Sequence, residues 1–183
     1  GSEMCIRDSI GTAFNGLRNY DLAAQNYEKA FDINPNSPLI SHNFAIALMK
    51  LKKFMDAKVI LENNIAKNNI NNRSQIDFAL CLFELGEIDN SVIEHKKAVA
   101  TFSRSFEVHN NYGNLLLFLG KDNEAITHFN IAKKISSNNP IIHYNLGRAE
   151  VSNKNYKKAL EHCDHALKAN PSFHKALNLA ALI

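Results

Sequence analysis

The densest group of chemically versatile side chains is the run His162-Cys163-Asp164-His165. Its composition suggests a metal site, but adjacent residues on a helix point in different directions. His162 and His165 are three residues apart and could share one helix face, yet two ligands do not make a structural zinc site. Cys163 falls at a place that suits the apolar core, which indicates a small hydrophobic residue. We therefore expect no metal and no other cofactor.

Nucleophilic and phosphate-transfer chemistry also lack support. Cys81 falls at a helix-packing place, so a role as a nucleophile is only weakly indicated. The residue numbers of His109 and His143 differ by 34, and packing between neighbouring helices is the interpretation we favour for them. The sequence has no glycine-rich phosphate loop, no Gly-x-Ser-x-Gly and no His-Glu-x-x-His motif. We expect that this chain is not an enzyme.

A row of amide side chains offers chemistry for binding instead. Asn43, Asp77, Asn111 and Asn145 follow one another at a constant interval of 34 in residue number. An asparagine side chain has one acceptor oxygen and one amide that donates twice, so it can bond both backbone groups of an extended peptide. Asp77 interrupts the row, because an ionised carboxylate only accepts. The alternative is that asparagine is simply abundant in this chain and occupies an exposed polar face.

A second group of candidate residues lies beside the end of this row. Tyr144 and Arg148 are four residues apart, which places them on the same face of a helix. Together with Asn111, Asn114 and Asn145 they form the best candidate pocket for a peptide. Arg148 could pair with a ligand carboxylate, and Tyr144 could add apolar area and a hydrogen bond. A solvated helix face without a ligand is again the alternative.

The elements that must position these residues repeat with the same interval of 34. Small residues recur at this period in two sets: Gly11, Ala45, Ala79, Gly113 and Gly147, and Ala23, Ala57, Ser91, Ala125 and Ala159. Each repeat contains two apolar stretches with helical spacing, and the small residues let the paired helices approach closely. A single helix pair cannot bury its apolar faces alone, so we expect the repeats to stack.

The pattern predicts the bounds of the helices. First helices are expected near 10–17, 38–51, 72–85, 106–119 and 140–153, and second helices near 20–33, 54–67, 88–101, 122–135 and 156–169. A last helix is expected to begin near His174. Gly86 and Gly120 fall between first and second helices, where a positive φ is often needed. The asparagine-rich segment 68–72 marks the joint that we expect to be weakest.

The repeat resembles the tetratricopeptide repeat, or TPR. The residues that carry the resemblance in the first copy are Gly11, Phe14, Tyr20, Ala23, Tyr27, Ala30 and Pro35. Those in the fifth copy are Tyr144-Asn145-Leu146-Gly147, Tyr156, Ala159, Ala166 and Pro171. The resemblance covers residues 9 to 183 as repeats 4–37, 38–71, 72–105, 106–139 and 140–173, with a partial repeat at 174–183. The chain departs from the family pattern by lacking tryptophan and by placing Asp122 where an aromatic residue is usual.

This resemblance implies the fold and the class of function. The fold would be all-α, an α-solenoid of antiparallel helix pairs in a right-handed superhelix whose first helices line a concave groove. The function would be a protein–protein interaction module that binds an extended peptide segment in this groove. A lysine pair that some family members use to grip a C-terminal carboxylate is absent here, so we do not expect that clamp.

Two further interpretations remain open. Similar arrays precede catalytic domains such as O-linked N-acetylglucosamine transferases and sulfotransferases, so the chain could be a partner- or substrate-recruiting arm of a larger enzyme. A scaffold that self-associates through the exposed end of the array is the other, because exposed apolar patches drive association. Its contact residues would be Leu177, Leu179, Leu182 and Ile183.

Composition limits the remaining classes of function. The 183 residues are 45% hydrophobic and 21% charged with a net charge of +3, which suits one folded array. The longest apolar runs, 115–119 and 179–183, are far shorter than the roughly 18 residues of a membrane span. No cluster of Lys and Arg would follow a phosphate backbone. We therefore expect a protein or peptide partner, no nucleic acid, no membrane and a cytoplasmic location.

The first residues are expected to be foreign to the protein. Residues 4–9, Met-Cys-Ile-Arg-Asp-Ser, back-translate into DNA that resembles the transposon-end adapter of sequencing libraries. Residues 1–9 are therefore set aside, and 10–183 are treated as a single repeat array. The chain also stops within the apolar stretch 176–183, so we expect a fragment that is open at both ends.

Overall fold

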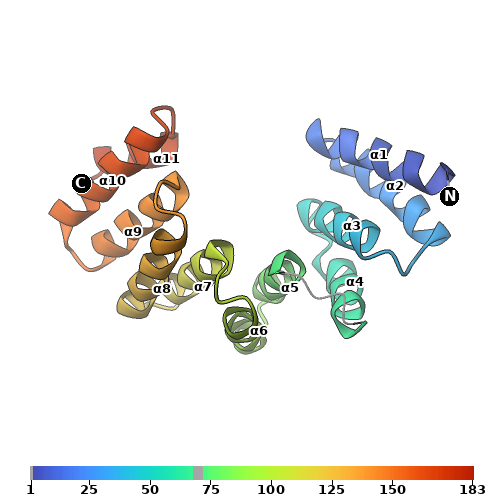
Figure 1. Cartoon of the computed structure of the whole chain (residues 1–183), viewed down its shortest axis with the longest axis horizontal. Helices are drawn as coiled ribbons and strands as arrows, with labels where there is room; N and C mark the ends of the chain where they lie inside the picture. Colours follow the sequence, from blue (N-terminus) through green and yellow to red (C-terminus); the bar gives the residue numbers. More distant parts are fainter. Residues whose placement is uncertain (1, 68–71) are drawn as a thin grey trace. The chain divides into compact units, whose positions relative to one another are not determined.

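The computed structural model of the chain describes residues 2–67 and 72–183, and over these residues it contains eleven α-helices and no strand (Figure 1). The first helices of the pairs are α1 (Ser2–Gly16), α3 (Pro38–Lys50), α5 (Asn72–Glu84), α7 (Phe106–Phe118) and α9 (Pro140–Ser152). The second helices are α2 (Tyr20–Ile33), α4 (Phe54–Ala66), α6 (Ile88–Thr101), α8 (Asp122–Ile135) and α10 (Tyr156–Ala169), and α11 (His174–Ala181) follows them. The predicted all-α fold of helix pairs is confirmed.

Local sequence explains where three of the first helices begin. Ser37, Ser105 and Asn139 each use a side-chain oxygen to accept a hydrogen bond from a backbone N–H in the first turn of α3, α7 and α9. Pro38 and Pro140 occupy the first position of their helices, where no backbone donor is needed. These polar residues and prolines stand between one repeat and the next, so they separate each second helix from the following first helix.

The turn inside each pair uses one backbone conformation in all five repeats. Arg18, Lys52, Gly86, Gly120 and Lys154 stand at the same place of successive repeats, and all have positive φ, between 58° and 78°. The sequence predicted this conformation only at the two glycines. The other three residues carry a Cβ into the left-handed region, where a side chain is disfavoured.

The first helix is longer than expected. We predicted a start near residue 10, whereas α1 begins at Ser2 and includes the segment set aside as adapter-derived. Residues 2–9 contain neither proline nor glycine, so nothing in them interrupts a helix that continues toward the N-terminus. Whether this segment is foreign to the protein stays a prediction. The predicted weak joint at 68–72 lies almost entirely outside the described residues.

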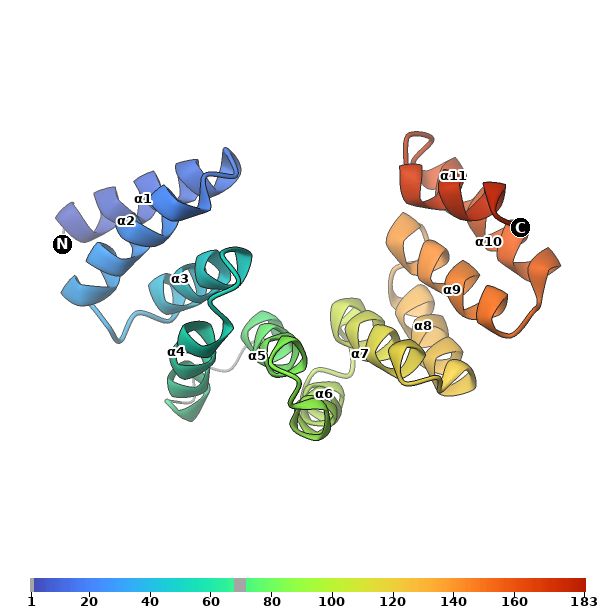
Figure 2. The same ribbon diagram turned by 180° about the vertical axis from the view of Figure 1, so that it is seen from behind.

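Internal contacts divide the chain into two compact units, Gly1–Glu94 and His95–Ile183, which are described separately. In unit 1, α3 packs on both α2 and α4, and the apolar faces of the helices form one buried cluster. In unit 2, α7 packs with α8, α8 with α9, and α9 with α10 (Figure 2). These helices thus pack against their neighbours in sequence, as stacking of repeats requires.

Matched side-chain volumes set how closely paired helices approach. A Cβ added at Gly11 would lie 2.7 Å from Cε1 of Tyr27, and one added at Gly113 would lie 2.6 Å from Cε1 of Phe129. In the second repeat these two places hold Ala45 and Leu61, both buried in the same cluster. In the first and fourth repeats a six-membered ring in the second helix therefore accompanies glycine in the first helix, and in the second repeat leucine accompanies alanine. The third repeat holds Ala79 with the smaller ring of His95, and both are buried.

The fifth repeat combines glycine with a small side chain at these two places. Gly147 lies opposite Cys163, whose Sγ would be 3.6 Å from an added Cβ. Cδ2 of Leu179, from α11, would be 3.3 Å from the same point. The next helix thus supplies the apolar volume that a ring supplies in the first and fourth repeats.

Along the part of the chain described here, no helix has the length and apolar content to cross a bilayer.

Candidate functional site

The predicted asparagine row connects successive first helices within each unit. In unit 1, Nδ2 of Asn43 on α3 donates to Oδ1 of Asp8 on α1 at 3.2 Å. In unit 2, Nδ2 of Asn145 on α9 donates to Oδ1 of Asn110 on α7 at 2.9 Å. In both cases the acceptor belongs to the preceding repeat, and its residue number is 35 lower than that of the donating asparagine. The bonds hold neighbouring repeats in register.

Asp77 makes the corresponding contact with a different chemistry. Its Oδ2 lies 3.7 Å from Nε2 of His42, which occupies the equivalent place in the preceding repeat. Burial raises the pKa of Asp77 to about 6, while the nearby charges of Arg73 and Lys50 oppose this rise. Burial, with a smaller effect from Arg73, lowers the pKa of His42. The charges of both side chains change with pH, which distinguishes this contact from the amide bonds of the other repeats.

Asn111 differs from the rest of the row. Its Nδ2 donates to the backbone oxygen of Glu107 in its own helix at 2.8 Å. The residue 35 places before Asn111 is Ile76, whose side chain cannot accept a hydrogen bond. Asn145 is only 3% exposed. The side-chain amides of Asn43, Asn111 and Asn145 thus all donate within the chain, so a peptide would have to exchange these bonds to use them.

Unit 2 contains a pocket of about 360 Å³ between α7, α9 and the start of α11. Its lining residues are Asn114, Ile141, Tyr144, Asn145, Arg148, Phe173 and Lys175. Four of them were predicted from the sequence, whereas Asn111 does not line the pocket. Sequence reasoning missed Ile141, Phe173 and Lys175. Ile141 shares the helix face of Tyr144 and Arg148, a spacing that could have revealed it. Phe173 and Lys175, at the start of α11, gave no such signal.

Arg148 is held in place by groups of the pocket. Its Nη1 lies 3.3 Å from Oδ1 of Asn114 and 3.4 Å from Oδ1 of Asn145, and donates to both. The guanidinium carbon is 5.8 Å from the ring centroid of Tyr144. The ring of Phe173 meets the Tyr144 ring edge to face, with centroids 5.7 Å apart. The charge therefore stands beside two rings that offer apolar contact area.

Two cationic side chains give the pocket a positive charge. Arg148 and Lys175 are both exposed, and among the described residues no carboxylate forms an ion pair with either of them. A guanidinium bonds a carboxylate through two parallel hydrogen bonds, and an ammonium adds a further charge. Together with the rings, these groups suit an acidic group that lies next to an apolar one.

Histidine rings contact one another between the paired helices α9 and α10. The His143 ring lies 5.7 Å from the His162 ring and 5.1 Å from the His165 ring, measured between centroids. Nε2 of His143 donates to the backbone oxygen of Ser137 at 2.9 Å, which leaves a lone pair on Nδ1. Burial lowers the pKa of His162 to about 4. Three such rings suggest a metal site, but within the described part of the chain no cluster of His, Cys, Asp and Glu has a geometry that could hold a metal ion.

The two buried cysteines lack the properties of nucleophiles. Sγ of Cys81 donates to the backbone oxygen of Phe54 at 3.0 Å, and burial raises the pKa of this thiol to about 11. Burial also raises the pKa of Cys163. A thiol with a raised pKa stays protonated at neutral pH and is unreactive. Both residues act as small apolar side chains of the core.

The fold defines a helical-repeat protein, and a pocket opens beside two of its first helices. Family models give the particular repeat. A model described as tetratricopeptide repeat matches residues 140–173, another of the same description matches 8–37, and one described as TPR repeat matches 113–151. The chain is a tetratricopeptide repeat protein.

Solved structures with this fold are similar over almost the whole chain. TTC0263, a thermophilic TPR protein of Thermus thermophilus, is 19% identical with a TM-score of 0.87, covering 98% of this chain and 100% of that one. PilF of Pseudomonas aeruginosa is 16% identical with a TM-score of 0.79, covering 99% and 84%. YrrB, described as a TPR protein with an unusual peptide-binding site, is 19% identical with a TM-score of 0.66, covering 97% and 91%. Curated protein sequences give no match.

Proposed function

We propose that the chain is a protein-interaction module and that the pocket of unit 2 binds an extended peptide segment of a partner. The observation that carries the proposal is the exposed pair of cations, Arg148 and Lys175, beside the rings of Tyr144 and Phe173. These groups favour a segment with an acidic group, from Asp, Glu or a free C-terminus, next to an apolar side chain.

Two further observations support this proposal. Asn114 and Asn145 place their oxygens on the guanidinium of Arg148, so its position is set before a ligand arrives and less entropy is lost on binding. YrrB, which has the same fold, is described as having a peptide-binding site. The whole chain then acts by holding a partner, without chemistry of its own.

A peptide-display screen on the full chain tests the proposal. We expect the selected peptides to carry an acidic residue beside an apolar one. In a fluorescence anisotropy titration, Arg148→Ala and Lys175→Ala should each weaken binding by roughly tenfold, because each removes a charge that faces the ligand. Asn114→Ala should weaken it less, since Arg148 loses one of its two amide partners.

Two control variants test whether a loss of binding comes from the pocket itself, and not from the loss of any positive charge or of any asparagine in the row. Lys157→Ala removes an exposed charge on α10 that does not line the pocket, and Asn111→Ala removes the row member that bonds its own helix. Both should bind like the unmodified chain. Equal binding by a variant that lacks both Arg148 and Lys175 side chains would exclude this pocket as the binding site.

A further inference from the structure

A second pocket lies in unit 1, on the side formed by the second helices. It has a volume of about 430 Å³, within the range of roughly 300–1,000 Å³ that is usual for ligand sites. Both α2 and α4 pack on α3, and the pocket opens between them. Its lining residues are Asp21, Ala24, Gln25, Glu28, Phe44, Leu48, Leu51, Lys53, Asp56, Val59 and Ile60. None of them belongs to the segment expected to be adapter-derived.

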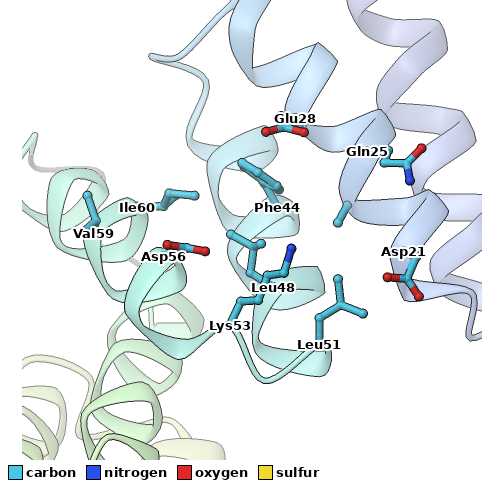
Figure 3. Close-up of a pocket in the computed structure, with 11 residues that line it drawn as sticks. Asp21, Gln25, Glu28, Phe44, Leu48, Leu51, Lys53, Asp56, Val59 and Ile60 are labelled. Carbon is cyan, nitrogen blue, oxygen red and sulfur yellow. The ribbon is translucent and has the colours of Figure 1, made fainter.

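The pocket has an apolar floor. Phe44, Leu48 and Leu51 come from α3 and its C-terminal cap, and Ala24 contributes from α2 (Figure 3). On the α4 side the wall continues through Val59, whose side chain is 57% exposed. Contact between this floor and an apolar side chain of a partner would remove both from water.

One small residue explains why the pocket exists in this repeat. Ala24 lines it, and the residues at the same place in the other four repeats are all larger: Lys58, Val92, Ile126 and Leu160. On α2, the residues Asp21, Gln25 and Glu28 share the helix face of Ala24, so the missing volume lies directly between the polar side chains of the rim. The small side chain of Ala24 therefore leaves room for this hollow in the first two repeats.

Acidic side chains surround the floor. Figure 3 shows the carboxylates of Asp21, Glu28 and Asp56 around Phe44 and Leu48. Lys53 supplies the one positive charge among the lining residues, so three carboxylates face one ammonium. The chain as a whole has a net charge of +3, which makes this local excess of negative charge a distinct feature.

We propose that this pocket binds a short segment of a second protein that places an apolar side chain, flanked by Lys or Arg, on the α3 floor. The apolar side chain supplies buried area, and the cations reach the carboxylates on α2 and α4. The partner chemistry is opposite in charge to that of the unit 2 pocket. The chain thus presents two binding sites for two different kinds of segment.

The experiment uses the full chain and synthetic peptides that share a central leucine or phenylalanine and differ in their flanks, which are Lys/Arg, Glu or uncharged. Fluorescence anisotropy should show that the basic set binds more tightly than the other two. Ala24→Leu fills the floor and should weaken this binding by about tenfold or more. Glu28→Gln and Asp56→Asn should each weaken it by about 3- to 10-fold, and added salt should reduce the difference between sets.

Matched variants keep the result specific. Glu62→Gln removes an exposed carboxylate of α4 that does not line the pocket, and it should bind the basic set unchanged. Arg148→Ala should also leave this binding unchanged, which separates the proposal from that for unit 2. Glu28→Gln and Asp56→Asn alter exposed side chains, so they test the site even where Ala24→Leu lowers stability. Three results would overturn the proposal. The first is no binding of the basic peptides, and the second is equal binding of all three peptide sets. The third is undiminished binding of the basic peptides by a variant that combines Glu28→Gln and Asp56→Asn.

Discussion

Replacing Gly113 by alanine tests whether matched side-chain volumes hold the helix pairs together. The new Cβ would lie 2.6, 2.8 and 3.0 Å from three ring carbons of Phe129, whose side chain is 0% exposed. Neither helix has free space at this point, so the ring or the backbone must shift. Overpacking of this kind costs about 1–3 kcal/mol. Removing glycine from a helix offsets this by roughly 1 kcal/mol. These magnitudes leave a net loss of up to about 2 kcal/mol in the free energy of unfolding, and the clash with a fully buried ring favours the upper end of that range.

Urea unfolding followed by circular dichroism measures this loss, and a second substitution tests its cause. Gly113→Ala combined with Phe129→Leu reproduces the pair that the second repeat contains, Ala45 with Leu61. The double variant should recover about 1 kcal/mol relative to the sum of the single effects. Gly16→Ala is the matched control, because an added Cβ there has no atom within 4 Å, and it should leave stability unchanged or raise it slightly. A Gly113→Ala variant as stable as the original chain, or a double variant without recovery, would refute the volume-matching explanation.

Three further predictions concern charge and backbone conformation. Because the pKa of His162 is lowered from 6.5 to about 4, the folded state favours the neutral ring, so stability should fall by about 1–2 kcal/mol as the pH drops through this range, after a discount for partial exposure. Urea titrations across this range should show a smaller fall in His162→Leu. Asp77 has a pKa raised to about 6, so ionisation above that pH opposes folding, and Asp77→Asn should stabilise the chain above about pH 6 by about 1–2 kcal/mol but have little effect near pH 4. A stabilisation that does not change with pH would contradict this account. Lys154 has φ 60°, so Lys154→Gly should raise stability by about 0.5–1 kcal/mol, whereas Gly120→Ala should lower it by about 1 kcal/mol; thermal unfolding of both variants checks the opposite signs.

The helical architecture followed from the sequence. The predicted bounds of the second helices α2, α6, α8 and α10 agree with the structure at both ends, and α3, α7 and α9 end one residue earlier than predicted. Local chemistry makes this possible, because apolar spacing and small residues at contact places act within one repeat and recur in all five, and polar caps add to them at several helices. The early start of α1 was missed because no residue there marks a helix end.

The structure revealed backbone and polar contacts that local patterns did not. Arg18, Lys52 and Lys154 adopt positive φ without the glycine that normally signals it, because the tight turn between packed helices imposes the conformation. The asparagine row was found by its period, but the acceptors of its bonds lie on the preceding first helix. Their identity depends on how two helices align side by side, which the spacing along one helix does not determine.

The two pockets show the same division between sequence and tertiary structure. Tyr144 and Arg148 were predicted as one site because four residues of helix bring them together. Phe173 and Lys175 reach that site only because α11 packs beside α9. The hollow at Ala24 exists because a side chain is small where three helices meet, and the space it leaves depends on residues from all three. Periodicity thus determined the elements and their core faces, whereas the two pockets required the positions of neighbouring helices, because a pocket is lined by side chains that are distant in the chain.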